Sequence, residues 1–399
     1  MSSGMSVRRI VLAYAINAVG GWFGLVALTI AIYDHSHSAF AVAGFFVASQ
    51  AVPALFVPVL VARLETVGRT SILAGVYLVE AALCVGLIFF IVHYSFPALL
   101  ALSMIDGVAS LAARALTRTG AAHAGRAESE LGGRAANAQL SIAFAVTLMA
   151  GPPLAGLLVG FGGSTVALGV DVVSFIVCAL MLSGLSVRAE RAESARSRLR
   201  AAALYLRENR PLRLLFTAQA VGLLAFMAAT PVEVLYVRST LGGSSLDYGL
   251  FIAAWGAGQV AGGAFFARRL DANLAPMLVL STLAISCGYG GFGIAPTFLV
   301  ACAFGVVGGA GNGVQWAALF STIQELAPKE MHARLMGALE SVGALCTTVG
   351  FVLGGAVANA YGPRAAMFTI AGLGLVATLL FARAVRVRVV SQPAPARSP

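Results

Sequence analysis

The chain has 399 residues, of which 59% are hydrophobic and 11% are charged, and its mean hydropathy is +0.90. Soluble globular domains carry roughly 25% charged residues, so the composition excludes an ordinary water-soluble protein. The long uninterrupted apolar runs also exclude a membrane β-barrel, whose strands alternate in polarity. The net charge of +10 does not indicate nucleic-acid binding, because the basic residues flank apolar segments, where membrane orientation and lipid headgroups account for them.

Twelve apolar segments are long enough to cross a bilayer, which takes about 20 residues as a helix. Hydropathy places them at residues 10–33, 39–62, 71–93, 97–117, 135–160, 164–187, 214–237, 246–267, 275–295, 297–322, 335–360 and 364–385. The first segment follows Arg8 and Arg9, as in a secretory signal. It is longer than the apolar region of a signal, about 7 to 15 residues, so we expect it to remain as a helix.

The basic residues lie almost entirely on one side of these segments. Of 26 lysines and arginines, only Arg238 and Arg364 fall on the side away from the N-terminus. Cytoplasmic loops retain Lys and Arg, so this asymmetry predicts a multi-pass protein of the inner (plasma) membrane with both termini in the cytoplasm.

The longest polar stretch divides the chain near its middle. Residues 188–213 carry eight arginines and are predicted to be a cytoplasmic linker that contains a surface helix. We therefore expect an N-terminal six-helix bundle at 1–187, a C-terminal bundle at 214–388, and a disordered tail at 389–399.

Short motifs repeat in the same order in the two halves. Gly44-Phe-Phe-Val-Ala48 matches Gly249-Leu-Phe-Ile-Ala253, and Gly151-Pro-Pro-Leu-Ala-Gly156 matches Gly350-Phe-Val-Leu-Gly-Gly355. Repeats in the same membrane orientation indicate parallel halves. The predicted fold is an all-α membrane protein of twelve transmembrane helices in two pseudo-symmetric six-helix bundles.

The segment from Gly151 to Gly156 includes Pro152 and resembles the antiporter motif GPxxGG of the major facilitator superfamily, in particular its drug and siderophore exporter branch. Small residues permit close approach of two helices and proline bends one. The resemblance covers residues 8–388 and implies two bundles around a central cavity. In that family the motif is associated with export.

Two further segments are similar to family patterns. Glu65, Gly68 and Arg69 match part of the loop motif GxxxDRxGRR, although Val61 and Thr66 replace its first glycine and first arginine; the match implies a gating charge network. Asp171-Val-Val-Ser-Phe175 is similar to a recurring exporter pattern. The arginine that many antiporters carry early in the fourth helix is missing, and Ser103 and Asp106-Gly107 occupy the comparable places.

Ionisable side chains at bilayer depth face a bundle interior or a wet cavity. The candidates for proton coupling or cavity charge are Asp106, Glu233, Arg114 and Glu80. The resemblance implies that the first, fourth, seventh and tenth helices line the cavity, which favours Asp106 and Glu233. Asp106 is the first candidate for proton coupling, because burial favours a protonated carboxyl group; the alternative is a structural hydrogen bond. For Glu233 an outer gate competes with a pair to Arg238, and Asp171 and Glu80 are interpreted as structural.

Amide and aromatic side chains on cavity-lining helices suit amphipathic organic ligands, although they are equally usual in helix packing. The candidate substrate contacts are Asn17, Trp22, Phe23, Gln50, Gln259, Asn312, Gln315 and Trp316.

Other chemistry is not indicated. The five cysteines lie singly within apolar segments, which supports neither a disulfide framework nor a metal site. A metal site would need His35, His37 and His93 to converge. The sequence has no GxxxxGK[ST] phosphate loop and no nucleophile, base and orienting group in a catalytic arrangement, so no enzymatic activity, cofactor or metal is expected.

These observations predict a secondary active transporter that exports drug-like amphipathic molecules in exchange for protons by alternating access. A siderophore-like metabolite as export substrate, or uptake of a nutrient, is the related alternative. A membrane sensor or scaffold that does not transport is the alternative from a different class. The expected partners are the substrate, protons and lipid, with the chain acting as a monomer.

Overall fold

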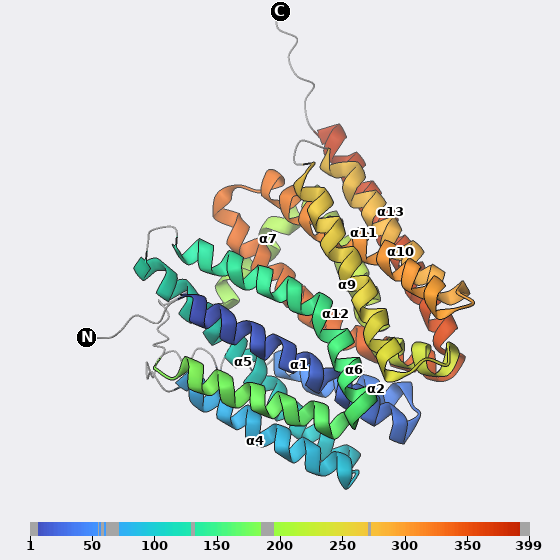
Figure 1. The fold of residues 1–399 in the computed structure, drawn as a ribbon. Helices are drawn as coiled ribbons and strands as arrows, with labels where there is room; N and C mark the ends of the chain where they lie inside the picture. Colours follow the sequence, from blue (N-terminus) through green and yellow to red (C-terminus); the bar gives the residue numbers. More distant parts are fainter. Residues whose placement is uncertain are drawn as a thin grey trace, which may run out of the picture.

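The computed structural model describes residues 7–54, 56, 60, 72–128, 132–184, 195–269 and 273–391. The elements assigned in these residues are all helical (Figure 1). They are α1 (Val7–Ser36), α2 (Ala39–Phe46), the π-helix η1 (Val47–Ala51), α4 (Ile72–Val92), α5 (Phe96–Glu128), α6 (Gly132–Leu182), α7 (Ala195–Glu208), α8 (Arg210–Leu235), the π-helix η2 (Tyr236–Thr240), α9 (Ser245–Ala267), α10 (Leu274–Ile294), α11 (Phe298–Leu326), α12 (Lys329–Tyr361) and α13 (Pro363–Ser391).

These helices account for the twelve predicted crossings. Within the described residues, ten helices are long and apolar enough to span a membrane, and a shorter apolar helix runs from Ala39 to Ala54. α6 supplies two crossings, because its path breaks at Gly163 and the chain turns back there (Figure 1). We call residues 132–162 the first arm of α6 and residues 164–182 its second arm.

The break in α6 has a counterpart in the second half. Gly163 has φ 78° and ψ 171°, and Gly362, between α12 and α13, has φ 85° and ψ 166°. Residues that carry a Cβ atom rarely adopt such positive φ angles, so glycine is needed at both turns. The two glycines are related by the same offset as Gly151 and Gly350, so the internal repeat extends to the backbone conformation.

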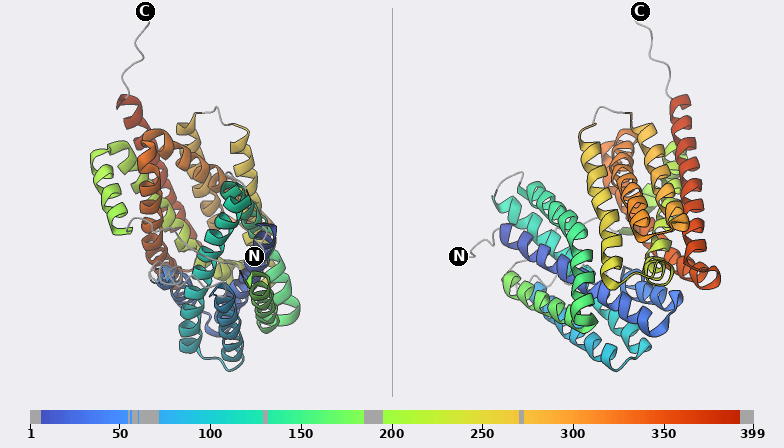
Figure 2. Two further views of the ribbon diagram at one scale, coloured as in Figure 1. Left: turned by 90° about the vertical axis from the view of Figure 1, so that its left-hand side faces the viewer. Right: turned by 45° about the vertical axis from the view of Figure 1, so that its right-hand side comes forward.

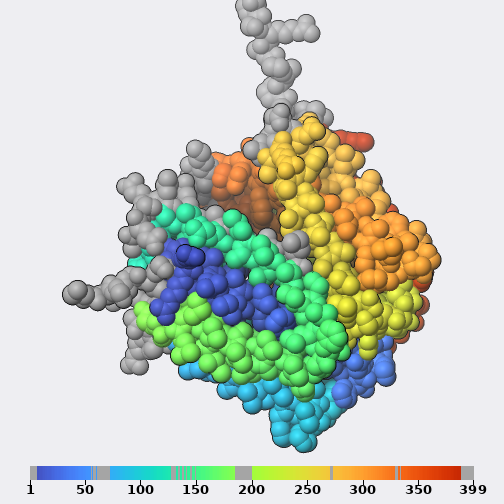
Figure 3. Space-filling view, viewed as in Figure 1, coloured from blue at the N-terminus to red at the C-terminus, as the bar shows by residue number. Residues whose placement is uncertain are grey.

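The helices form two groups that meet at one end and diverge towards the chain termini (Figures 1 and 2). α1 to α6 make one group and α8 to α13 the other, while α7, within the predicted linker, packs against α12 and α8. In the first group α1 lies between the two arms of α6, as the space-filling view shows (Figure 3). The structure is therefore closed at the end opposite the termini.

Glycines bring the two groups into contact at the closed end. A Cβ added to Gly156 of α6 would lie 2.5 Å from the carbonyl oxygen of Ser245 and 3.2 Å from the Cα of Gly249, both on α9. At the equivalent position of the second half, a Cβ on Gly355 would lie 2.5 Å from the Cβ of Ala43 on α2. Helix backbones approach this closely only where side chains are absent or small.

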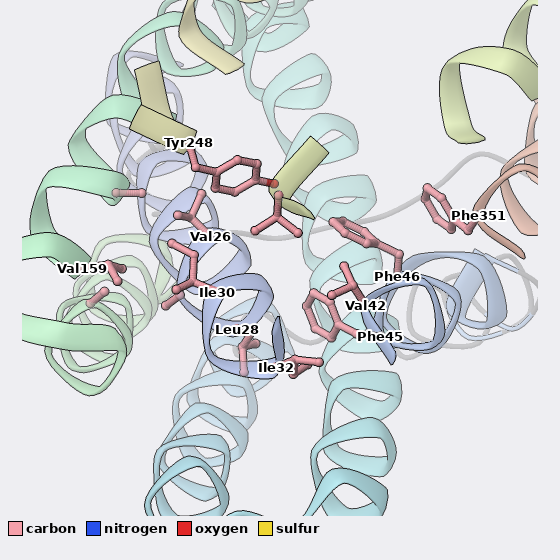
Figure 4. Packing of buried hydrophobic residues seen from close by; sticks show 14 of the residues in the cluster. Val26, Leu28, Ile30, Ile32, Val42, Phe45, Phe46, Val159, Tyr248 and Phe351 are labelled. Carbon is pink, nitrogen blue, oxygen red and sulfur yellow. The ribbon is translucent and has the colours of Figure 1, made fainter. Parts of the chain in front are cut away.

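Apolar side chains surround these two contacts. Phe46 of α2 packs against Phe351 of α12 with ring centroids 5.3 Å apart, and Tyr248 of α9 lies next to Val26 of α1 (Figure 4). The buried hydrophobic cluster to which these residues belong includes side chains of both groups. A second cluster, which contains Leu319, is formed by residues of α7 and of the second group.

The two arginines predicted on the outer side both make specific contacts. Arg238 of η2 forms an ion pair of 2.8 Å with Asp34 near the end of α1, which links the two groups. Arg364 donates hydrogen bonds to the carbonyl oxygens of Gly293 and Ala295 at the end of α10, where cationic groups stabilise the exposed carbonyls. Arg238 therefore pairs with Asp34 and not with Glu233, which the sequence offered as one alternative.

We predict that Arg238→Ala shifts the protein towards a form open at this end. The ion pair is partly exposed, with the side chains of Arg238 and Asp34 26% and 43% accessible. It therefore stabilises the closed form by at most about 1 kcal/mol. Its loss should change the ratio of closed to open molecules by up to about fivefold. The measurement is the spin-label distance distribution between Val92→Cys and Ile294→Cys at the ends of α4 and α10, after replacement of the native cysteines.

The matched control is the charge-reversed double variant Asp34→Arg/Arg238→Asp, which should restore the wild-type distribution. If Arg238→Ala leaves the distances unchanged, the ion pair does not hold the closed end.

Candidate functional site

A polar cavity of about 260 Å³ lies inside the first group of helices. Its walls come from α1, α2, η1, α4, α5 and the second arm of α6. The polar and charged side chains that line it are Asn17, Ser49, Gln50, Ser103, Asp106, Ser110, Arg114 and Asp171. Its volume is sufficient for water or for a small polar group among apolar walls.

Asp106 of α5 is the central carboxylate of this cavity. The residue is partly accessible, yet its Oδ1 atom is buried and accepts no hydrogen bond. Two further lining groups, the hydroxyl oxygens of Ser49 and Ser103, are also buried without a partner. Buried polar atoms are nearly always satisfied by protein or by water, so these three atoms identify a place that is built to hold water, a proton or a ligand.

Arg114 lies two helical turns from Asp106 along α5, and the two charges interact electrostatically. Its guanidinium is exposed and donates to the Ser110 hydroxyl at 3.3 Å. Arg114 forms no ion pair with a carboxylate whose side chain the structure describes. The acidic side chains of the cavity are therefore left without a fixed counter-ion.

Glu80 of α4 lies behind the cavity wall. Its side chain is fully buried, and neither oxygen accepts a hydrogen bond of ordinary geometry, although the Ser110 hydroxyl lies nearby. The charges of Asp106, Asp171 and Arg114 all act on it. The first group of helices thus holds three acidic side chains and one arginine within mutual electrostatic range.

Asp171, on the second arm of α6, fits into a notch in α1. Its Oδ1 accepts a hydrogen bond of 3.1 Å from Ser174, and a Cβ on Gly24 would lie 2.7 Å from its Oδ2. A Cβ on Gly20, one turn earlier, would meet both Ser174 and Asp171. Gly20 and Gly24 form a GxxxG pair, which lets helices approach closely. The sequence shows this pair, but only the fold shows which side chain fills it.

The π-helix η1 forms part of the cavity wall. It contains Ser49 and Gln50, and the backbone carbonyl of Ser49 packs against Gly107 of α5, where a Cβ would overlap it. Single π-helical turns inside α-helices occur frequently at functional sites. The hydropathy of the predicted segment 39–62 gives no signal for this change of helical pitch.

The predicted substrate contacts do not converge on one site. Asn17, Trp22 and Gln50 line the cavity, and the Trp22 side chain packs against Gly151 of α6. Phe23 packs against the large hydrophobic cluster instead.

The candidates in the second half are used differently. The Gln315 side chain donates a hydrogen bond to Gln219 of α8, and Trp316 packs against Phe320 at 5.4 Å in the second hydrophobic cluster. Asn312 is buried, and the Gln259 backbone packs against Gly309 and Gly313 of α11. All lining residues of this cavity belong to α1–α6, so it does not test the expectation that residues of 297–322 and α1 share a central substrate cavity, which stays a prediction.

Glu233 of α8 lies away from this cavity, in the second group. Its charge acts on Tyr248 of α9 and Tyr289 of α10. The hydroxyl of Tyr289 and the Nε1 atom of Trp255 are buried without hydrogen-bond partners. The sequence analysis missed Trp255 and Tyr289, because a tryptophan or tyrosine within an apolar run looks the same whether it packs or binds.

Some predictions fall on other parts of the chain. Glu65, Gly68 and Arg69 lie outside the described residues. Among the described residues no three His, Cys, Asp or Glu side chains are placed to hold a metal ion; His35 stacks on Tyr94 at 4.2 Å.

The architecture is shared with solved membrane transporters. The structure is similar to the nucleoside transporter NupG, with a TM-score of 0.75, 14% identity and coverage of 95% of this chain and 98% of that one. It is also similar to a bacterial homologue of the iron transporter ferroportin in an inward-facing state, with a TM-score of 0.73, 15% identity and coverage of 95% and 98%. The chain has the major facilitator fold.

Sequence comparison agrees with the fold in the second half. Residues 215–399 match the family model described as Major Facilitator Superfamily. A bacterial homologue of the human lysosomal transporter Spinster, inward-facing and occupied, has a TM-score of 0.73 and 14% identity over 98% of both chains. None of the curated proteins compared matches this chain in sequence. Two of these structures are named for unrelated cargoes, nucleosides and iron, so the shared fold identifies the architecture and not the substrate.

We predict that Gly24→Ala destabilises the protein by about 1 to 3 kcal/mol, because the added methyl group would overlap the Asp171 carboxylate. The measurement is thermal unfolding of the purified protein in detergent. Gly21→Ala is the matched control on the same turn of α1, since nothing lies within 4 Å of a Cβ there.

The methyl group that Gly24→Ala adds has no carboxylate to overlap once Asp171 is also replaced. In the double variant Gly24→Ala/Asp171→Ala, the Gly24→Ala substitution should therefore cost much less stability than it does in the wild-type background. If Gly24→Ala and Gly21→Ala lower the stability of the protein equally, the contact with Asp171 does not constrain α1.

Proposed function

We propose that this protein is a secondary active transporter that exports a small amphipathic organic molecule in exchange for protons by alternating access. The observation that carries the proposal is the buried, unpartnered Oδ1 of Asp106 beside a polar cavity, within a fold shared with transporters. An acidic side chain enclosed in a membrane-spanning bundle is expensive, and such groups mark proton and substrate pathways.

A proton can resolve the electrostatic conflict within the first group of helices. Glu80, Asp106 and Asp171 act on one another, and no fixed cation contacts them in the described residues. Full ionisation would bring like charges together in a low dielectric. Protonation of Asp106 removes part of this repulsion, and entry of a cationic substrate would remove it in another way. A proton and a cationic substrate would thus compete for the same carboxylates, and such competition is what exchange of one for the other requires.

The closed end supports a rocking mechanism. The helix contacts at Gly156 and Gly355 join the two groups at one end only, while the helices diverge at the other. If the termini are cytoplasmic, as the distribution of arginine predicts, the observed form is open to the cytoplasm. Separation of the two groups at these contacts would then produce the outward-open form.

The direction of transport is inferred from residues 151–156. The segment resembles the antiporter motif, and its Gly156 and Pro152 take part in the contact with α9. We therefore favour export, by a monomer of the inner membrane that uses the proton gradient and no cofactor. Binding without flux would instead identify a sensor on the same fold.

The test is accumulation of ethidium, a fluorescent amphipathic cation, in pump-deficient cells that express wild type or Asp106→Asn, with and without a protonophore. We expect low accumulation in wild type, abolished by the protonophore. Asp106→Asn should raise accumulation to the level of cells without the protein, because an amide cannot exchange a proton.

The control variant is Glu208→Gln, which makes the same chemical change at an exposed carboxylate of α7 and should behave as wild type. Equal accumulation in wild-type and empty cells would contradict export of amphipathic cations.

A further inference from the structure

A second polar site lies inside the second group of helices, around Glu233. Side chains that α8 and α9 extend towards each other form it. Phe226 and Glu233 are seven residues apart on α8, and Tyr248 and Trp255 are seven residues apart on α9. Seven residues make almost two full turns, with a drift of only about 20°, so each pair lies on one face of its helix. α10 adds Tyr289.

The aromatic rings of this site are in direct contact. The centroid of Trp255 lies 5.8 Å from that of Phe226 and 5.0 Å from that of Tyr289. Glu233 is near enough for its charge to act on the hydroxyl groups of Tyr248 and Tyr289. Three helices thus bring one carboxylate and a wall of aromatic rings together.

The hydrogen-bonding capacity of this wall is not used within the protein. Tyr289 is 1% exposed and its hydroxyl has no partner, and the buried Nε1 atom of Trp255 has none either. Tyr236, in the same aromatic cluster, donates a 2.6 Å hydrogen bond to the carbonyl oxygen of Phe292. The donors of Tyr289 and Trp255 therefore differ from that of Tyr236, because they have no partner within the protein.

Glu233 also lacks a counter-ion. It is partly accessible, and its side chain has no hydrogen bond or ion pair in the described part of the chain. Arg238, the cationic side chain that follows it along the same helix, is held by Asp34. A carboxylate in this setting favours a cation that arrives from elsewhere.

We propose that Glu233, Trp255 and Tyr289, with the ring of Phe226, bind the ammonium group of an organic cation that also carries a hydrogen-bond acceptor. Aromatic faces and a carboxylate attract an ammonium group, and an ester, ether or carbonyl oxygen of the same ligand satisfies the Trp255 N–H and the Tyr289 hydroxyl. The inference rests on the proposed function, since it names the class of molecule to be transported and a place in the second half that recognises it.

The experiment measures binding on the purified full chain in lipid nanodiscs, with no gradient, by calorimetric titration. The ligands are benzoylcholine and its neutral isostere 3,3-dimethylbutyl benzoate, in which carbon replaces the ammonium nitrogen. We expect benzoylcholine to bind at least about tenfold more tightly than the isostere, and Glu233→Gln to abolish this preference.

The tyrosine pair supplies the matched control. Tyr289→Phe should weaken benzoylcholine binding about three- to tenfold, because it removes a hydroxyl that only the ligand satisfies. Tyr236→Phe removes a hydroxyl that the protein already satisfies, so it should lower the unfolding temperature and leave the affinity within about twofold. Trp255→Phe should weaken binding while it preserves an aromatic ring.

Three results would overturn the proposal: equal affinity for the two ligands, a cation preference that persists in Glu233→Gln, or equal effects of the two tyrosine variants. Equal effects of Tyr289→Phe and Tyr236→Phe on affinity would show that the ligand does not bind the Tyr289 hydroxyl, which water would then satisfy. Binding is measured on the purified protein without transport, so its result can be interpreted even if the export test in cells fails. Conversely, export that depends on Asp106 but no cation binding at Glu233 would contradict this inference and leave the proposed function intact.

Discussion

The arrangement of the two halves depends on the absence of side chains at a few helix crossings. Gly156 meets α9 and, at the equivalent place, Gly355 meets α2, each at a distance that a Cβ would prevent. Apolar association alone gives little preference between helices in lipid, so close backbone approach and the pair of Asp34 with Arg238 determine where the halves join. Both kinds of contact lie at the closed end, which must separate when the halves rock in the proposed mechanism.

The same principle positions the acidic side chains. Gly20 and Gly24 open a notch in α1 for Asp171, and Gly107 lets the η1 backbone reach α5 beside Asp106. Burial of a charge without a partner is costly, yet the first half holds three carboxylates with no direct cation contact in the described residues. Such a local conflict, retained within an otherwise well-packed bundle, is typical of a functional site.

The two halves divide the proposed tasks. The first carries the polar cavity with Asp106, which suits exchange of protons, and the second carries Glu233 beside Trp255 and Tyr289, which suits recognition of an organic cation. Under the proposed mechanism coupling would follow from the rocking of one half against the other, because alternating access would open the two groups to one side of the membrane at a time.

The sequence by itself determined the number and order of the helices and the internal repeat, because hydropathy and residue order can be read along a single chain. It also pointed to Asp106, since a carboxylate in an apolar run is visible without a structure. Which side chains meet was decided by tertiary packing: Arg238 selects Asp34 over Glu233, Gln315 is taken by Gln219, and Asp171 fills the notch in α1. Those choices depend on contacts between helices distant in the chain, for which no single segment carries a signal.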